Sequence, residues 1–514
     1  MSYKELAATI SHSGVAACFG IPGSGASLNL IDELERVNIP FYLTHFEGSG
    51  AVMAATAGHI SDTVGLSISI KGPGLLNALP GIAAAWFEAF PLIHVAEATP
   101  DTAPPWVAHK RLPQQDLCSV VTKSDGYLSY DPECYEAAVK IATCEEPAPV
   151  LMQIGEGEAP VPVDMIDLDD KETNFQDVWK SIAKCENPIL IVGAFAARQG
   201  LGMHLVDLKL PIFTTVAGKG IVDETKVHAA GVFTGVDQEL TAEWNVFPKA
   251  DFVISVGLSA REMLKVKKFS CQSLHVGSIV STGLEGFGFD WFLGLEHFPE
   301  LISKLAEKSW GEEIVARSRQ QVEDKLTKGF LPGGVFQQIE RHFSSKVRLV
   351  LDTGSFCTVG EHVWRAQQPD WFLASGQGRY MGTCLPMAIG AAIADQSVPT
   401  IAVMGDGSIG MYLSDIKLAV QHRLPILFIL MTDGGFGSIR ISARKNSYGF
   451  SPIQVDGRSW VDCVNGLGVS GDRVETAQSF ENALKAWIPG NGPAFIEIGF
   501  DPDQYETMVM GVRS

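Results

Sequence analysis

Short apolar runs alternate along the chain with longer segments that are amphipathic or rich in small residues. Most of these runs end in a turn that contains glycine, proline or an acidic residue. The pattern is typical of buried parallel strands that are joined by crossover helices. It predicts an α/β fold in which helices cover both faces of open, doubly wound parallel sheets.

The alternation falls into three blocks, and we expect one sheet domain from each. Residues 1–165 hold the runs VAACFG, IPFYLTHF, VGLSISI and PLIHVAEA, and residues 175–310 hold PILIVG, LPIFTTVAGKG and ADFVISVG. Residues 333–514 hold VRLVLDTG, TIAVM, ILFILM and FIEIGF, with a helix expected over MYLSDIKLAVQHR. The acidic stretch after the first block suits a linker, and the polar segment 438–452 suits a mobile lid or an ordinary surface loop.

Acidic, glycine-rich turns follow two successive apolar runs of the third block. TIAVM leads into GDGS at 405–408, and ILFILM leads into TDGG at 432–435. A glycine turn between a strand and a helix exposes backbone N–H groups that suit a diphosphate. Because the carboxyl ends of neighbouring strands share one crevice, we expect Asp406 and Asp433 to meet at Mg²⁺, with a carbonyl near Gly435 as third ligand. A Rossmann-like turn with an incidental aspartate is the alternative.

Glu47 lies between the apolar run IPFYLTHF and the small-residue segment GAVMAATAGHIS, so we expect it to be largely buried. A buried carboxylate is costly without a partner, and beside a glycine-rich crevice it is a candidate functional group. The alternative is a glutamate at a helix N-terminus, where the helix dipole favours it.

Composition and charge narrow the class of protein. The chain has 514 residues, a hydrophobic content of 46% and a formal net charge of −20, which indicate a multidomain globular protein and argue against nucleic acid or an anionic membrane as partner. Nine cysteines without a CxxC pair indicate reduced thiols. The N-terminus has no apolar signal core, and no apolar run approaches the ~20 residues of a membrane span. We therefore expect a cytoplasmic protein.

Together these motifs resemble the thiamine-diphosphate-dependent enzymes of the acetohydroxyacid synthase, pyruvate oxidase and 2-oxo acid decarboxylase group, and acetolactate-synthase-like proteins most closely. The resemblance covers nearly the whole chain. It rests on GIPGSG at 20–25, HFEGSGAVMAA at 45–55, KGPGLLN at 71–77, MGTCLPMAIGAAIA at 381–394, GDGS at 405–408 and TDGG at 432–435. It implies a pyrimidine-binding domain, a middle domain and a diphosphate-binding domain for the three blocks.

The resemblance also implies roles for individual residues. Glu47 would hydrogen-bond N1′ of the cofactor pyrimidine and so promote the C2 ylid, which adds to the carbonyl of a 2-oxo acid before CO₂ is lost. Met381 would support the bent cofactor, and Asp406, Asp433 and the Gly435 carbonyl would hold Mg²⁺. The residues expected to bind thiamine diphosphate are Pro73, Gly74, Asn77, Met381, Gly405, Asp406, Gly407, Ser408, Asp433, Gly435, Phe436 and Gly437.

Several positions depart from the family pattern. The usual Asn-Asn of the second turn is Thr432-Asp433, which adds a negative charge beside the diphosphate. Phe46 replaces the usual histidine before the glutamate, and we expect His45 to point away from Glu47. The chain has no adjacent His-His pair, which disfavours a typical pyruvate decarboxylase.

Lys71 stands where the family has serine or threonine, close to the expected reaction centre. Its ammonium group can hold a substrate carboxylate or a second anionic group; a lysine that reaches solvent or pairs with an acid is the alternative. Further substrate contacts are expected from a looser match to the family at Ser24, Gly25, Gln115 (with its neighbour Gln114) and Arg440.

We expect a carboligase of the acetolactate-synthase type, which transfers an acyl group from a 2-oxo acid to an acceptor. The resemblance implies a homodimer at minimum and favours a homotetramer. A non-oxidative 2-oxo acid decarboxylase that releases an aldehyde is the second interpretation. The middle block is short and has neither a flavin motif nor a GxGxxG turn, so we expect neither FAD nor NAD(P). A flavin oxidase, a nucleotide-dependent oxidoreductase and a catalytically silent regulatory homologue are the remaining alternatives.

Overall fold

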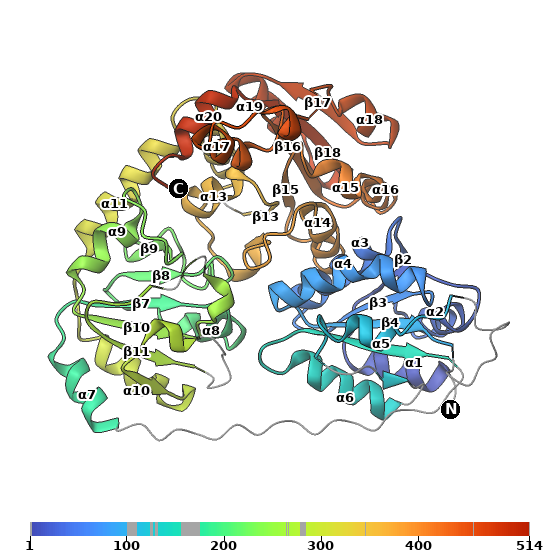
Figure 1. The fold of residues 1–514 in the computed structure, drawn as a ribbon, viewed down its shortest axis with the longest axis horizontal. Coiled ribbons are helices and arrows are strands. Elements are labelled where there is room, and N and C mark those ends of the chain that lie inside the picture. The colour runs from blue at the N-terminus through green and yellow to red at the C-terminus, as the bar shows by residue number, and fades with distance from the viewer. Residues whose placement is uncertain are drawn as a thin grey trace.

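The structure is a computed structural model, and it describes residues 3–99, 110–123, 127–128, 132–155, 175–263, 265, 267–277, 284–344, 346–455 and 457–512. Three six-stranded sheets follow one another along the chain, and every strand pairing in them is parallel. Figure 1 shows the three sheet units with their covering helices, the first in blue and the third in orange and red. The predicted α/β fold is thus confirmed.

The first sheet has the order β2-β1-β3-β4-β6-β5. Its strands are β1 (Cys18–Ile21), β2 (Phe41–Leu43), β3 (Gly65–Ser69), β4 (Leu92–Glu97), β5 (Tyr127–Leu128) and β6 (Pro149–Ile154). Its helices are α1 (Tyr3–His12), α2 (Ala26–Arg36), α3 (Glu47–Ile60), α4 (Pro73–Glu88), α5 (Gln114–Cys118) and α6 (Pro132–Thr143). The strand order reverses between β1 and β3, so a ligand crevice is expected beyond the carboxyl ends of these two strands.

The second sheet has the order β12-β11-β10-β7-β8-β9 and reverses between β7 and β10. Its strands are β7 (Pro188–Val192), β8 (Ile212–Thr214), β9 (Ala229–Val232), β10 (Phe252–Val256), β11 (Gln272–Val276) and β12 (Trp291–Leu293). The α-helices are α7 (Phe175–Lys184), α8 (Ala194–Arg198), α9 (Ala242–Val246), α10 (Phe298–Leu305) and α11 (Glu312–Leu326). Short 3₁₀ helices are η1 (Leu201–His204), η2 (Phe247–Lys249), η3 (Ala260–Glu262), η4 (Leu284–Phe287) and η5 (Leu295–His297).

The third sheet has the order β14-β13-β15-β16-β18-β17 and reverses between β13 and β15. Its strands are β13 (Arg348–Leu351), β14 (Phe372–Ala374), β15 (Thr400–Gly405), β16 (Ile426–Thr432), β17 (Ser470–Val474) and β18 (Ala494–Gly499). Its α-helices are α12 (Pro332–Phe343), α13 (Ser355–Val363), α14 (Cys384–Ala394), α15 (Ile409–Tyr412), α16 (Ile416–Gln421), α17 (Gly437–Lys445), α18 (Val461–Gly466), α19 (Ala477–Ala486) and α20 (Pro502–Val509). Its 3₁₀ helices are η6 (Pro369–Trp371), η7 (Leu413–Asp415), η8 (Ser451–Ile453) and η9 (Pro489–Asn491).

The core explains why the central strands are apolar on both faces. β16 reads ILFILMT, and all of it except its last residue is buried, because helices cover both sides of the sheet. Among the described residues, no helix combines the length and the apolar character that a membrane crossing needs.

The first and third units meet through helices that are rich in alanine and glycine. α3 packs against α14, and Figure 1 shows α14 beside α3 and α4. Small residues let the two backbones approach closely. Two buried carboxylates add hydrogen bonds across this contact: Asp415 accepts from Ser49 Oγ at 2.5 Å, and Glu88 accepts from Ser375 Oγ at 2.9 Å and from the N–H groups of residues 376–378.

Three predicted elements differ from the observed ones. The strand expected over IPFYLTHF is short, because Thr44 turns the chain by donating to the Phe46 carbonyl. The helix expected over MYLSDIKLAVQHR is broken by η7, which carries Asp415 toward the backbone N–H of His45. The segment expected as a lid or loop begins as the helix α17.

Candidate active site

The predicted site residues lie at the carboxyl ends of strands that form or adjoin two switch points, one in the first sheet and one in the third. Glu47 begins α3, and the turn at 71–74 links β3 to α4. GDGS at 405–408 follows β15, and TDGG at 432–435 follows the neighbouring β16. These are the positions at which open α/β sheets bind ligands.

Glu47 is buried, with 8% of its surface exposed, as the sequence predicts. Its Oε2 accepts a hydrogen bond from Asn77 Nδ2 at 3.1 Å. A methyl group added to Gly74 would lie 3.4 Å from Oε1, so the KGPG turn borders that oxygen. Within the described residues Oε1 accepts no hydrogen bond, which leaves one carboxylate oxygen available to a ligand.

A buried glutamine supports the turn that carries Lys71. Gln114 Oε1 accepts from Gly72 N at 2.7 Å, and its Nε2 donates to Gln153 Oε1 at 2.9 Å. Gln114 is thus part of the turn's support, whereas its neighbour Gln115 is half-buried. Lys71 is also half-buried, and no hydrogen bond or ion pair engages its ammonium group within the part of the chain that the structure describes.

The GIPGSG turn before α2 is fixed by a carboxylate from β4. Glu97 Oε1 accepts from Ser27 N at 2.9 Å and from Ser27 Oγ at 2.5 Å. Ser24 and Gly25, which precede this contact, are exposed at the carboxyl end of the sheet. Sequence analysis missed Glu97 and Ser27 because they are far apart in the chain.

Asp406 connects the two acidic turns, as the sequence predicts for neighbouring strands. Its Oδ2 accepts from Thr432 Oγ1 at 2.8 Å, from Gly434 N at 2.9 Å and from Gly435 N at 3.2 Å. Only 8% of the residue is exposed. Its Oδ1 accepts no hydrogen bond within the described residues, so this oxygen is available to a cation.

Asp433 lies beside Asp406 and pairs with Arg440. Asp433 Oδ2 is 3.0 Å from Arg440 Nη1, and Arg440 Nη2 donates to the Asp433 carbonyl at 3.2 Å. Burial raises the pKa of Asp433 to about 6; Arg440 opposes that rise and Asp406 adds to it. A methyl group added to Gly437 would lie 2.7 Å from Asp433 Oδ2, so glycine is required for this side-chain position.

Asp352, at the end of β13, completes this switch point and was missed by the sequence analysis. Its carboxylate accepts from Gly382 N at 3.0 Å and from Thr353 N at 2.7 Å. Burial raises the pKa of Asp352 to about 6, and a hydrogen bond from Ser408 opposes the rise. The sequence did carry a signal for Asp352, because this residue ends the apolar run VRLVLD, much as Asp406 follows the apolar run TIAVM. Asp352 thereby holds the backbone next to Met381, which is half-buried.

The donor set fits Mg²⁺ and thiamine diphosphate. Glu47, Asp406 and Asp433 each use one carboxylate oxygen for a protein contact and leave the other without one in the described residues. Two carboxylate oxygens and a nearby carbonyl are hard ligands of the kind that Mg²⁺ prefers. Gly407 packs so closely on Phe436 that a methyl group would lie 2.8 Å from its ring, so a side chain at this position would displace the ring.

The two groups of residues have separate hydrogen-bond networks in one chain. Phe46, next to Glu47, contacts the ring of Tyr412, and His45 lies against Asp415 rather than beside the Glu47 carboxylate. Apolar side chains are exposed beside both groups: Leu76 is 40% exposed next to Asn77, and Met411 is 51% exposed after the GDGS turn.

The switch point of the second sheet is filled by the protein itself. Glu262 Oε2 accepts from Ala194 N at 2.8 Å and from Thr215 Oγ1, and Oε1 accepts from Ser259 N at 3.0 Å. Burial raises the pKa of this carboxyl to about 7. A side-chain carboxylate thus lies at the start of α8, where a nucleotide phosphate would bind in a dinucleotide-binding sheet.

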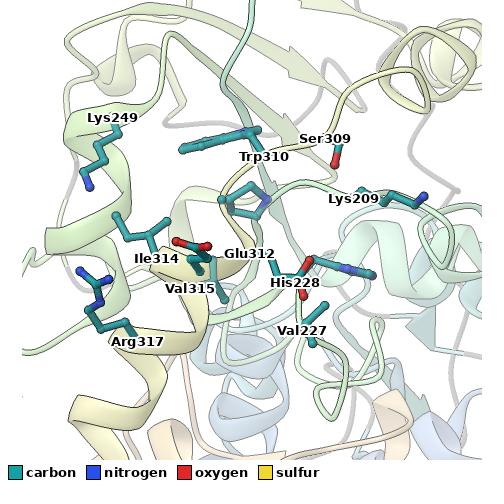
Figure 2. Close-up of a pocket in the computed structure, with 13 residues that line it drawn as sticks. Lys209, Val227, His228, Lys249, Ser309, Trp310, Glu312, Ile314, Val315 and Arg317 are labelled. Atoms are coloured by element: carbon teal, nitrogen blue, oxygen red, sulfur yellow. The ribbon is translucent and has the colours of Figure 1, made fainter.

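A cavity of about 670 Å³ lies in the second unit at the start of α11 (Figure 2). None of the predicted site residues lines it. Figure 2 shows Lys249 and Arg317 on one side and Lys209 on the other, so the cations do not converge on one point. Glu312 in the same lining offsets their charge. We assign no ligand to this cavity.

Comparison with known proteins places both switch points in matched regions. Residues 3–117 match the family model for the thiamine pyrophosphate enzyme N-terminal TPP binding domain, and residues 352–498 match that for the C-terminal TPP binding domain. A probable acetolactate synthase large subunit of Methanocaldococcus jannaschii is 24% identical, over 96% of this chain and 91% of the relative. A catabolic acetolactate synthase of Raoultella terrigena is 23% identical, over 95% and 93%. An acetolactate synthase large subunit of Porphyra purpurea is 25% identical, over 95% and 90%.

Proposed function

This chain belongs to the thiamine pyrophosphate enzyme family and is an acetolactate-synthase-like, thiamine-diphosphate-dependent enzyme, and from this premise we propose that it is a Mg²⁺-dependent carboligase acting on a 2-oxo acid. The observation that carries the proposal is the shared arrangement of Glu47, Asp406 and Asp433. Each carboxylate is fixed by one oxygen and offers the other at a switch point.

The cofactor, when bound, supplies a thiazolium carbon that adds to the substrate carbonyl and accepts the electron pair released with CO₂. Glu47 would hold a proton at the pyrimidine ring, since its buried carboxylate favours a strong hydrogen bond. Asp406 and Asp433 would hold Mg²⁺ against the diphosphate, with the Gly435 carbonyl as third ligand. The turn at 405–408 would donate backbone N–H groups to the phosphate oxygens.

We propose Lys71 as a substrate contact. Lys71 begins the KGPG motif, three residues before Gly74, and the closeness of Gly74 to Glu47 supports a place for Lys71 on the same crevice. An ammonium group that has no partner among the described residues favours a substrate anion, either the 2-oxo acid carboxylate or a second acidic group. Ser24, Gly25 and Gln115 are weaker candidates for the same pocket.

We also propose a homodimer at minimum, and a homotetramer by family resemblance, in the cytoplasm. The exposed Leu76 and Met411 support a second copy, because each lies beside one half of the expected cofactor site. Burial of such side chains favours association. Neither FAD nor NAD(P) forms part of the proposal.

The test measures CO₂ release from a panel of 2-oxo acids, with and without a second acidic group, in the presence of Mg²⁺ and thiamine diphosphate. Products are sorted by mass spectrometry into aldehydes and acyloins for wild type, Glu47→Gln and Lys71→Ala. We expect acyloins from wild type. Glu47→Gln should lower the rate of CO₂ release about 100-fold or more, because proton transfer at the pyrimidine is lost. Lys71→Ala should raise KM most for the acid with the extra anionic group.

Other outcomes separate the alternatives. Aldehydes without acyloins would identify a decarboxylase. Cofactor binding without CO₂ release from any acid would favour a silent homologue or a donor of another class. Unchanged kinetics of Lys71→Ala for every accepted acid would remove Lys71 from the site. Yellow protein with a flavin spectrum would contradict the expected absence of FAD.

A further inference from the structure

We propose that Arg440 is a positioning residue that forms a charge-neutral unit with Asp433, so that this acidic turn can accept Mg²⁺ and a diphosphate as a neutral asparagine would. The inference rests on the proposed function, because it concerns the same cofactor site. It assigns Arg440 to the turn instead of to the substrate.

Arg440 contacts Asp433 through two guanidinium nitrogens. Nη1 lies 3.0 Å from the carboxylate Oδ2, and Nη2 donates to the backbone carbonyl of the same residue at 3.2 Å. Both side chains are buried, with 9% of Arg440 and 8% of Asp433 exposed. The contact therefore fixes the side chain and the main chain of the turn together, and the planar guanidinium suits such a two-point contact.

The negative charges at this switch point explain why a positively charged side chain beside Asp433 favours binding of a diphosphate. Asp352, Asp406 and Asp433 all lie at the carboxyl ends of adjacent strands, and a diphosphate would add further negative charge. Within the described residues, only one of these three carboxylates forms an ion pair, and it is Asp433 with Arg440. Leaving a buried carboxylate unpaired beside a diphosphate costs free energy.

The pairing leaves the right oxygen free. Arg440 binds Oδ2, and no other described residue donates a hydrogen bond to Oδ1 of Asp433. A methyl group added to Gly435 would lie 2.4 Å from the Ile453 carbonyl oxygen and 3.1 Å from Arg440 Nη2, so the turn packs closely against both. The pair thus presents one oxygen and no net charge, which is what an asparagine amide would present.

The experiment measures the Kd of thiamine diphosphate at saturating Mg²⁺, by quenching of tryptophan fluorescence, in wild type, Arg440→Met, Asp433→Asn and the double variant. We expect Arg440→Met to weaken binding about tenfold in the wild-type background, because a buried carboxylate loses its partner. In the Asp433→Asn background the same substitution should change Kd less than about threefold, since no carboxylate is left to neutralise. Arg440→Lys keeps the charge but cannot make the two-point contact, so it should weaken binding less than Arg440→Met does.

The outcomes are distinguishable. Equal losses from Arg440→Met in both backgrounds would overturn the inference and indicate a direct contact between Arg440 and the ligand. No loss in either background would also overturn it. Far-UV circular dichroism of the cofactor-free variants controls for misfolding, and Arg440→Gln, which also removes the charge, repeats the comparison in both backgrounds if Arg440→Met unfolds. Failure of wild type to bind thiamine diphosphate would overturn the proposed function and this inference with it.

Discussion

Single carboxylate oxygens define the candidate site at the scale of the residue. Asp406 shows the principle most clearly, because Oδ2 takes three donors from the turn after β16 while Oδ1 takes none in the described residues. A carboxylate that is held by one oxygen is preorganised to bind a cation with the other, and its orientation is fixed before the metal arrives.

We expect Asp406→Ala to weaken Mg²⁺-dependent binding of thiamine diphosphate about 100-fold, because the loss of a direct ligand should cost at least as much as the loss of a supporting residue. Isothermal titration of the cofactor with and without Mg²⁺ measures the effect. Thr432→Val is the matched control: it removes one hydrogen bond to Asp406 and keeps the ligand, so the affinity should change only slightly. Undiminished binding by Asp406→Ala would refute the metal assignment.

Residues with local signals could be predicted from the sequence, and residues with distant partners could not. Glycine and aspartate at the end of an apolar run made the GDGS turn a candidate site, since the chemistry is contained in a few neighbouring positions. Asp415 carries no such signal, because its partner Ser49 is 366 residues away. Arg440 looked like a substrate contact for a different reason: Asp433 is near in the chain, but their pairing depends on the fold of the turn.

Tertiary contacts overrode several predicted elements at the scale of helices and strands. The long helix expected after GDGS divides at η7, where Asp415 reaches α3 of the first unit. The sequence predicted the sheets well because buried parallel strands are apolar throughout. It predicted the ends of helices less well, because those depend on neighbours from another unit.

The Glu262 carboxyl group makes the free energy of unfolding depend on pH. Burial raises its pKa from the ordinary 4.5 to about 7, so between these values the folded protein keeps a proton that the unfolded chain loses. The free energy of unfolding should therefore fall as pH rises through this window, by about 3 kcal/mol at most.

Thermal unfolding followed at pH values from 4.5 to 8 measures this effect. Glu262→Gln mimics the protonated side chain, and we expect it to reduce the loss of stability between these values. Glu296→Gln, which changes an exposed carboxylate in the same unit, is the control and should leave the slope as in wild type. Identical slopes in wild type and Glu262→Gln would contradict the prediction.

The arrangement of the two half-sites is a property of the whole molecule. The first and third units of one chain are held together by Glu88 and Asp415, and Leu76 and Met411 remain exposed beside the two half-sites. The proposed dimer would pair Glu47 of one chain with Asp406 of its partner. Each chain would then contribute to two different sites.

Mixing two inactive variants tests this arrangement. Glu47→Gln and Asp406→Ala chains, unfolded and refolded together, should form heterodimers in which one of the two sites is intact, and recover about a quarter of the wild-type activity. Each variant refolded alone is the control and should stay inactive. If the mixture also stays inactive while wild type refolds to full activity, both half-sites come from one chain.

The position of β18 has a consequence for synthesis of the chain. β18 is the last of the third sheet's strands in chain order, yet it lies inside that sheet and pairs with both β16 and β17. While the nascent chain leaves the ribosome, the edge of β16 stays open and β17 has no neighbour, and such open edges invite wrong pairings. A chain that stopped before Ala494 would lose the strand next to the one that ends at Thr432, so damage near the C-terminus would reach the cofactor turn directly.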